Sequence, residues 1–187
     1  MPNYGYLDEA DARNKMLDEK LGEGVMSNLV AGANDAIVEH HTEIWKYQAD
    51  MSYIPEGFDI SAMTVVNVST DSVRASMGKE FSELVKEAVA AMKKVNAPVN
   101  WFAYSIPFGK GDYAFVTWGK DRSSLHGGPD MNELLAKALG PDGSKEMWDR
   151  YVEYIASTED RDWRARTDLS YTSDEKADEA AMPEKSE

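Results

Sequence analysis

Apolar residues follow two periodicities along this chain: every second residue in some segments, and every third or fourth in others. Residues 7–20 and 25–43 have the helical spacing, and Gly22 and Gly24 separate them. Residues 44–53 alternate instead, which predicts a strand with one packed face. The residues on that face are Trp45, Tyr47, Ala49, Met51 and Tyr53.

A second series of elements begins near residue 61. A short β-branched strand is predicted at 63–68, and residues 69–71 are expected to cap the helix that follows. An apolar stripe at helical spacing predicts that helix between Met77 and Val95. The remaining predicted elements are a hairpin of strands 99–106 and 112–118 with its turn at 109–111, helical segments 130–139 and 144–158, and a last strand 162–171.

The order of these elements is β-α-β-β-α-β, which predicts an α+β fold of the ferredoxin-like kind. In this fold two helices cover one face of a four-stranded antiparallel sheet. The other face must then meet water, a ligand or a second sheet. On the last strand we expect Trp163 to be buried under the helices, with Trp45 in the equivalent place.

Part of the sequence is repeated. When residues 6–53 are shifted by 118 positions, they align without a gap on residues 124–171, and ten of the 48 pairs are identical. Chance would give about three identities. The clearest stretch aligns 45–53 with 163–171, and both copies end in Asp-x-Ser-Tyr. The second copy is preceded by further strands and a helix, whereas almost nothing precedes the first.

The repeat predicts the domain organisation. Residues 1–54 form a partial repeat of helices and one strand, and residues 55–60 form a linker. Residues 61–171 form the complete ferredoxin-like unit. Residues 172–187 are polar, acidic and poor in aromatic side chains, and we expect this tail to be disordered.

The composition excludes several classes of function. A net charge of −14 argues against nucleic acid and against anionic membranes as partners, because both require a basic surface. The absence of cysteine excludes disulfides, thiolate metal sites and cysteine nucleophiles. The N-terminus is too polar for a signal peptide. We therefore expect a cytoplasmic protein, or an exported one if Met1 is not the native start.

The last predicted strand carries the strongest candidate for a binding site. Arg164, Arg166 and Asp168 share one face, and two guanidinium groups beside a carboxylate could hold an anionic or carbonyl-bearing ligand. A structural ladder of ion pairs, or a solvated face, accounts for the same pattern. If the apolar face of this strand packs under the helices, its polar face points away from them.

Aromatic residues and one histidine complete the candidate site. Trp101 and Tyr104 lie in the aromatic-rich hairpin and could wall a cavity for a flat apolar ligand, and His126 follows the hairpin. Residues 39–43 contain a histidine and a glutamate at helical spacing, but no third ligand is evident, so we predict no metal. We predict no cofactor either.

Three motifs resemble those of a known superfamily. They are the aromatic strand 101–104, the Lys-Ala-Leu-Gly element at 137–140 and the Arg-x-Asp-Leu-Ser-Tyr ending at 166–171. Together they resemble uncharacterised bacterial members of the dimeric α/β-barrel superfamily, which also includes antibiotic-biosynthesis-type monooxygenases and NIPSNAP-like proteins. The resemblance covers residues 61–171 and, through the repeat, 6–53. It implies that two sheets face each other around a central cavity, and it implies no catalytic residues.

Two hypotheses of function follow. The first is an oligomeric module, most simply a homodimer, which binds a small apolar or anionic ligand or is purely structural. The alternative is a cofactor-independent monooxygenase or isomerase acting on an aromatic or carbonyl substrate in the barrel cavity. The enzyme requires the candidate polar and aromatic side chains to converge on one cavity, whereas the module does not.

Overall fold

The computed structural model describes residues 15–165 except 18, 23 and 40, and it divides the chain into two compact units, Met1–Thr42 and Glu43–Glu187. In the first unit, residues 15–17 and 19–21 are helical and α2 spans Val25–Ala36. Gly22 and Gly24, with φ of 99° and 84°, separate them as predicted. α2 ends before residue 43, because the backbone becomes extended at Ile37. No helix in the described part of the chain could cross a bilayer.

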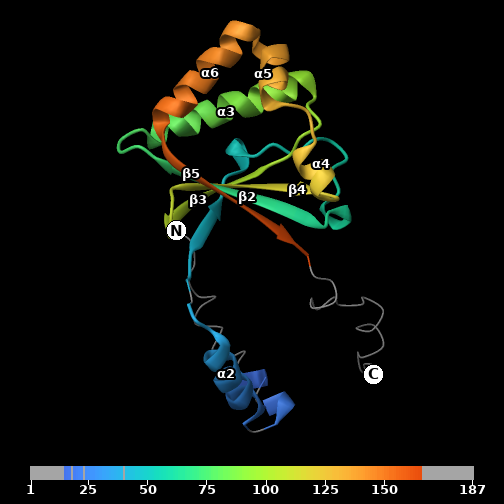
Figure 1. The fold of residues 1–187 in the computed structure, drawn as a ribbon, viewed down its shortest axis with the longest axis vertical. Helices are drawn as coiled ribbons and strands as arrows, with labels where there is room; N and C mark the ends of the chain where they lie inside the picture. The colour runs from blue at the N-terminus through green and yellow to red at the C-terminus, as the bar shows by residue number, and fades with distance from the viewer. Residues whose placement is uncertain (1–14, 18, 23, 40, 166–187) are drawn as a thin grey trace, which may run out of the picture. The chain divides into compact units, whose positions relative to one another are not determined.

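The second unit contains a five-stranded antiparallel sheet in the order β1-β3-β4-β2-β5 (Figure 1). Its helices α3, α5 and α6 lie on one side of this sheet. The predicted α+β, ferredoxin-like fold is therefore confirmed, with one additional edge strand. The strands are β1 (Ile44–Tyr47), β2 (Val65–Val73), β3 (Phe102–Phe108), β4 (Tyr113–Gly119) and β5 (Ile155–Arg164). The helices are α3 (Gly78–Val95), α4 (Arg122–His126), α5 (Met131–Leu139) and α6 (Pro141–Tyr154).

The additional strand is β1, which pairs antiparallel with β3. The segment predicted as the strand of a partial repeat thus belongs to the sheet of the second unit, which begins at Glu43. Residues of the predicted linker also pack on this unit, since the ring of Phe58 lies 6.1 Å from that of Phe102. The added strand hydrogen-bonds an edge of the sheet that would otherwise be unpaired.

The prediction of one continuous strand over 44–53 was wrong. The strand stops at Tyr47, and a 3₁₀ turn at Ala49–Met51 follows it. The hydroxyl of Ser52 accounts for the turn. It donates a hydrogen bond of 2.7 Å to Gln48 O and accepts one of 2.9 Å from Ala103 N. The side chain of Ser52 thus takes the place of a backbone acceptor for the Ala103 amide of β3. The chain then enters the core, where Met51 and Tyr53 are buried.

The boundaries around β2 and α3 also differ from the prediction. Residues 69–71 lie inside β2 and do not cap α3, which begins at Gly78 without a side-chain cap. The strand continues because it is paired on both sides, with β4 and with β5. The hairpin of β3 and β4 is confirmed. At its turn Gly111 has φ of 87°, and a Cβ there would meet Thr70 Cγ2 at 2.5 Å.

The second pair of helices is confirmed, but α6 ends at Tyr154 and β5 begins at once. Residues 155–158, predicted as helix, are therefore strand, because they pair with the end of β2. β5 is described as far as Arg164. The rest of the predicted last strand and the predicted tail at 172–187 lie outside the described residues.

The two sides of the sheet differ. The helix side holds the main core, in which Phe81 and Met92 of α3 are fully buried. None of the helices described for residues 43–165 lies on the opposite side, which we call the open face. Trp163 lies on the open face opposite Val66 and is 57% exposed, and Trp45 is 36% exposed. The prediction that both are buried under the helices was wrong.

Candidate functional site

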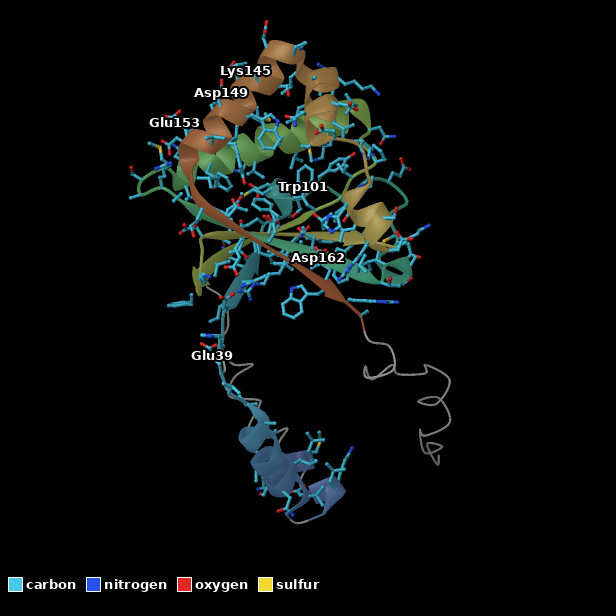
Figure 2. All side chains as sticks on the ribbon, viewed as in Figure 1. Glu39, Trp101, Lys145, Asp149, Glu153 and Asp162 are labelled. Atoms are coloured by element: carbon cyan, nitrogen blue, oxygen red, sulfur yellow. The ribbon has the colours of Figure 1, made fainter. Side chains whose placement is uncertain are left out.

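A pocket of about 270 Å³ lies between the helices and the sheet. We call it the helix-side pocket. Its floor comes from the sheet, where the strands contribute the polar residues Ser69, Asp71 and Thr117. Its walls come mainly from the helices and are apolar and aromatic. Among the wall residues are Phe81, Val85, Trp101, Leu135, Trp148 and Tyr151. Figure 2 shows Trp101 between the sheet and the helices.

Asp71 is the one acidic residue among the described residues that line this pocket. It lies in β2 opposite Thr158 of β5, and only 1% of its surface is exposed. Its carboxylate accepts a hydrogen bond of 2.7 Å from Thr158 Oγ1 and one of 3.1 Å from the Tyr151 hydroxyl. Both donors are neutral. Within the described residues no lysine, arginine or histidine forms an ion pair with Asp71.

Burial raises the pKa of the Asp71 carboxyl above its ordinary value, because a charge in an apolar environment loses hydration. The hydrogen bonds from Thr158 and Tyr151 oppose this change, and the nearby carboxylate of Asp160 reinforces it. Ordinary surface acids have pKa values near 4. An acid whose pKa is raised by burial is typical of functional sites.

Tyr151 reaches Asp71 from α6. Met147, Trp148 and Tyr151 all line the pocket, as their spacing on one helical face requires. Burial raises the pKa of Tyr151 to about 12, and the charge of Asp71 adds to the effect. The phenol is therefore protonated at neutral pH and donates to Asp71. This contact joins α6 to β2 of the sheet.

Two indole groups at the pocket differ in their hydrogen bonding. Trp101 Nε1 donates to Met51 O at 2.7 Å, which fixes the ring in the core. Trp148 Nε1 is buried and has no hydrogen-bond partner among the described residues. Buried polar atoms nearly always have a partner, so an unpaired donor beside a pocket suits a ligand that carries an acceptor.

The open face of the sheet carries a patch of aromatic rings. We call it the aromatic patch, and it consists of Trp45, Tyr47, Phe58, Phe102 and Tyr104. Neighbouring ring centroids are 5.6–6.4 Å apart. Tyr47 is 45% exposed although it contacts two other rings. Burial raises the pKa of Tyr104, and the neighbouring Tyr47 adds to this.

His126 lies at the end of α4, whose start is fixed by hydrogen bonds between Asp121 and Ser124. Its Nε2 is 2.7 Å from Asp162 Oδ2, and Asn67 Nδ2 donates to Asp162 Oδ1 at 3.1 Å. The bond with His126, helped by Asn67, holds the pKa of Asp162 below its usual range. These groups line a polar surface cleft together with Thr117, Leu125 and Asp160.

The six residues of the predicted site do not form one described cluster. Trp101 lines the helix-side pocket, whereas Tyr104 lies on the opposite face of the sheet. His126 pairs with Asp162 in the polar cleft. Arg164 is exposed at the end of β5, on the same face of the strand as Asp162 and therefore on the helix side. Arg166 and Asp168 lie outside the described residues.

Sequence reasoning missed three residues of the pocket: Asp71, Trp148 and Tyr151. The sequence pattern predicts a helix cap at Asp71, whereas the residue lies in β2. Its position in an apolar, β-branched segment was a usable signal, because aspartate is uncommon in strands. Trp148 and Tyr151 follow the helical spacing of α6, which is also the ordinary pattern of core residues.

The chain matches no protein-family model, and no curated protein matches it in sequence. It is similar to the crystal structure of a NIPSNAP family protein from Agrobacterium tumefaciens, with 16% sequence identity and a TM-score of 0.42. The similarity covers 64% of this chain and 96% of that chain. At this level the comparison assigns neither a family nor a function to this chain.

Proposed function

We propose that this protein is a ligand-binding module that holds a small, largely apolar molecule in the helix-side pocket. The observation that carries the proposal is the pocket itself, with its aromatic walls and a few polar groups at its floor. Ligand sites commonly combine an apolar lining with a small number of placed polar groups. Trp101, one of the residues predicted from the sequence, is part of this wall.

The size of the pocket limits the ligand. Its volume is about 270 Å³, and an apolar protein cavity of about 150 Å³ is large enough to bind benzene. A ligand with one or two rings and a short polar substituent therefore fits. Fatty acids, large cofactors and polymers do not fit within this volume.

The geometry favours a binding module over the alternative enzyme. A monooxygenase or isomerase of the expected kind would bring Tyr104 to the same cavity as His126 and Arg164, and Tyr104 lies on the opposite face of the sheet. Among the described residues, no histidine, lysine or arginine lines the helix-side pocket. Its functional groups are hydrogen-bonding groups suited to holding a ligand.

A pair of matched variants tests the proposal. Ala88 lines the pocket from α3, whereas Ala90 is exposed on the same helix. We expect the neutral probe 2-phenylethanol to bind the wild type with a dissociation constant on the order of 0.1–1 mM in isothermal titration. Ala88→Leu should abolish this binding by filling the pocket, and Ala90→Leu should preserve it. If the wild type does not bind the probe, or if both variants bind equally, the ligand is not held in this pocket.

The second part of the proposal is that two copies associate through the open face. Besides the aromatic patch, that face exposes Trp163, which is 57% exposed. Soluble monomers rarely expose so large an apolar area, and an isologous pair is the simplest closed assembly that covers it. The acidic surface of the chain, with its net charge of −14, gives no support to a nucleic-acid or membrane partner.

Light scattering at micromolar concentration tests the dimer. We expect a species of twice the chain mass of 20.9 kDa. Tyr47→Lys, which puts a charge into the aromatic patch, should convert it to monomer. Val152→Lys, at an apolar position on α6 that is 66% exposed, should leave it dimeric. A wild type that stays near 20.9 kDa would contradict the dimer but not the ligand site.

A further inference from the structure

We infer that the ligand of the helix-side pocket is an organic amine, bound as an ammonium ion by Asp71 against the aromatic wall. This inference rests on the proposed function and adds the chemical class of the ligand.

The first argument is the missing countercharge of Asp71. A buried carboxylate is stable when it is paired with a cation and fully hydrogen-bonded. Asp71 is 1% exposed, and the groups that contact its carboxylate are the hydroxyls of Thr158 and Tyr151. Among the described residues, the charge that raises its pKa is that of Asp160, which is also negative. An ammonium group in the pocket would supply the positive charge that the described residues do not.

The second argument is the aromatic wall. The ring of Phe81 lies 6.2 Å from those of Phe115 and Tyr151, and Trp148 meets Tyr151 edge-on at 5.5 Å. All four residues line the pocket. Aromatic faces attract cations through their quadrupole, and aromatic cages with a nearby carboxylate are a recurrent way to bind amines. The same rings would hold the apolar body of the ligand.

The third argument is selectivity against other ligands. A carboxylate or phosphate ligand would meet the charge of Asp71 without a compensating cation, so anions are disfavoured. The net charge of −14 also raises the local concentration of cations around the protein. The unpaired Nε1 of Trp148 adds a donor for an acceptor atom on the same ligand, such as a hydroxyl or ether oxygen.

The test compares 2-phenylethylamine with 2-phenylethanol, which have the same carbon skeleton and differ in the terminal group. Titration uses the full chain at neutral pH in about 0.15 M salt, which screens surface charges. We expect the amine to bind the wild type at least about tenfold more tightly than the alcohol, because a charged donor to a carboxylate forms a stronger bond than a neutral one. Asp71→Asn should remove this preference, so that the amine and the alcohol bind with similar affinity.

Asp160→Asn is the matched control, because it removes an exposed carboxylate that affects Asp71 and removes one negative charge, as Asp71→Asn does. It should keep the preference for the amine. Circular dichroism checks that both variants fold. As a measurement without a variant, the affinity of the wild type for the amine should fall as Asp71 is protonated at low pH, while its affinity for the alcohol stays constant. The groups that face Asp71 in this titration are Tyr151 from α6 and Thr158 and Asp160 from β5.

The outcomes separate the two proposals. If the alcohol binds and the amine has no advantage, or if the two carboxylate variants weaken amine binding equally, the assignment of an amine is wrong and the pocket remains a ligand site. If neither probe binds and Ala88→Leu has no effect, the proposed function fails, and the amine with it.

Discussion

Replacing each of two tryptophans at the helix-side pocket by phenylalanine should change stability in opposite ways. In Trp148→Phe the smaller ring loses about 1 kcal/mol of apolar burial. The substitution also removes a buried N–H without a partner, which regains about 1–3 kcal/mol. The ligand-free variant should therefore be as stable as the wild type, or more stable by up to about 2 kcal/mol.

Trp101→Phe makes the same change in size, but here the indole N–H has a partner. The variant loses the 2.7 Å bond to Met51 O and leaves that carbonyl unpaired in the core. The lost burial and the unpaired acceptor together should lower the free energy of unfolding by about 2–4 kcal/mol. The two variants thus isolate the contribution of one hydrogen bond, because the residue types exchanged are identical.

Equilibrium urea denaturation, followed by far-ultraviolet circular dichroism, measures both changes without relying on tryptophan fluorescence. The slope of unfolding free energy against urea should be the same in all three proteins, so that midpoints report stability. If Trp148→Phe is destabilised as much as Trp101→Phe, Nε1 of Trp148 is paired in solution. It would then not be available as a donor to a ligand.

Two further predictions concern Ser52 and Asp71. Ser52→Ala should lower the free energy of unfolding by about 2–4 kcal/mol, because it removes two hydrogen bonds and leaves the Ala103 amide unpaired in the core. The control Ser157→Ala, at an exposed site in β5, should change the free energy of unfolding by less than about 0.5 kcal/mol in the same urea titration. Because the pKa of Asp71 is raised, the folded state holds the proton of this carboxyl more tightly than the unfolded state does. The contribution of Asp71 to the free energy of unfolding is therefore largest in acid, and it is lost as the pH rises through the folded pKa. Relative to Asp71→Asn, the wild type should become less stable between about pH 4 and pH 7, and a difference that grows in favour of the wild type over that range would show that the pKa is lowered instead.

Elements whose signal is local could be predicted from the sequence. The apolar stripe of α3 repeats over its whole length, and the hairpin of β3 and β4 combines alternation with two turn glycines. The order of these elements limits the topology to a few arrangements, and the ferredoxin-like one is observed. The alignment of residues 6–53 with 124–171 also places α2 over residues of α6, and both are helical.

Alternation along a strand determines which residues share a face, but not which face meets the helices. Trp163 and Arg164 were correctly placed on opposite faces of β5, and only pairing with β2 decided that the tryptophan lies on the open face. Similarly, the pattern of 44–53 contained no sign that Ser52 would replace a ladder bond and direct Met51 and Tyr53 into the core.

The candidate site depends on the tertiary structure. Asp71 is 80 residues from Tyr151 and 87 from Thr158 along the chain, and these hydroxyls meet its carboxylate because β5 pairs beside β2 while α6 crosses above. Local sequence contains the acid, the phenol and the indoles as ordinary strand and helix residues. Burial of the acid without a cation, and the pocket beside it, arise when distant segments pack, since desolvation depends on every neighbour at once.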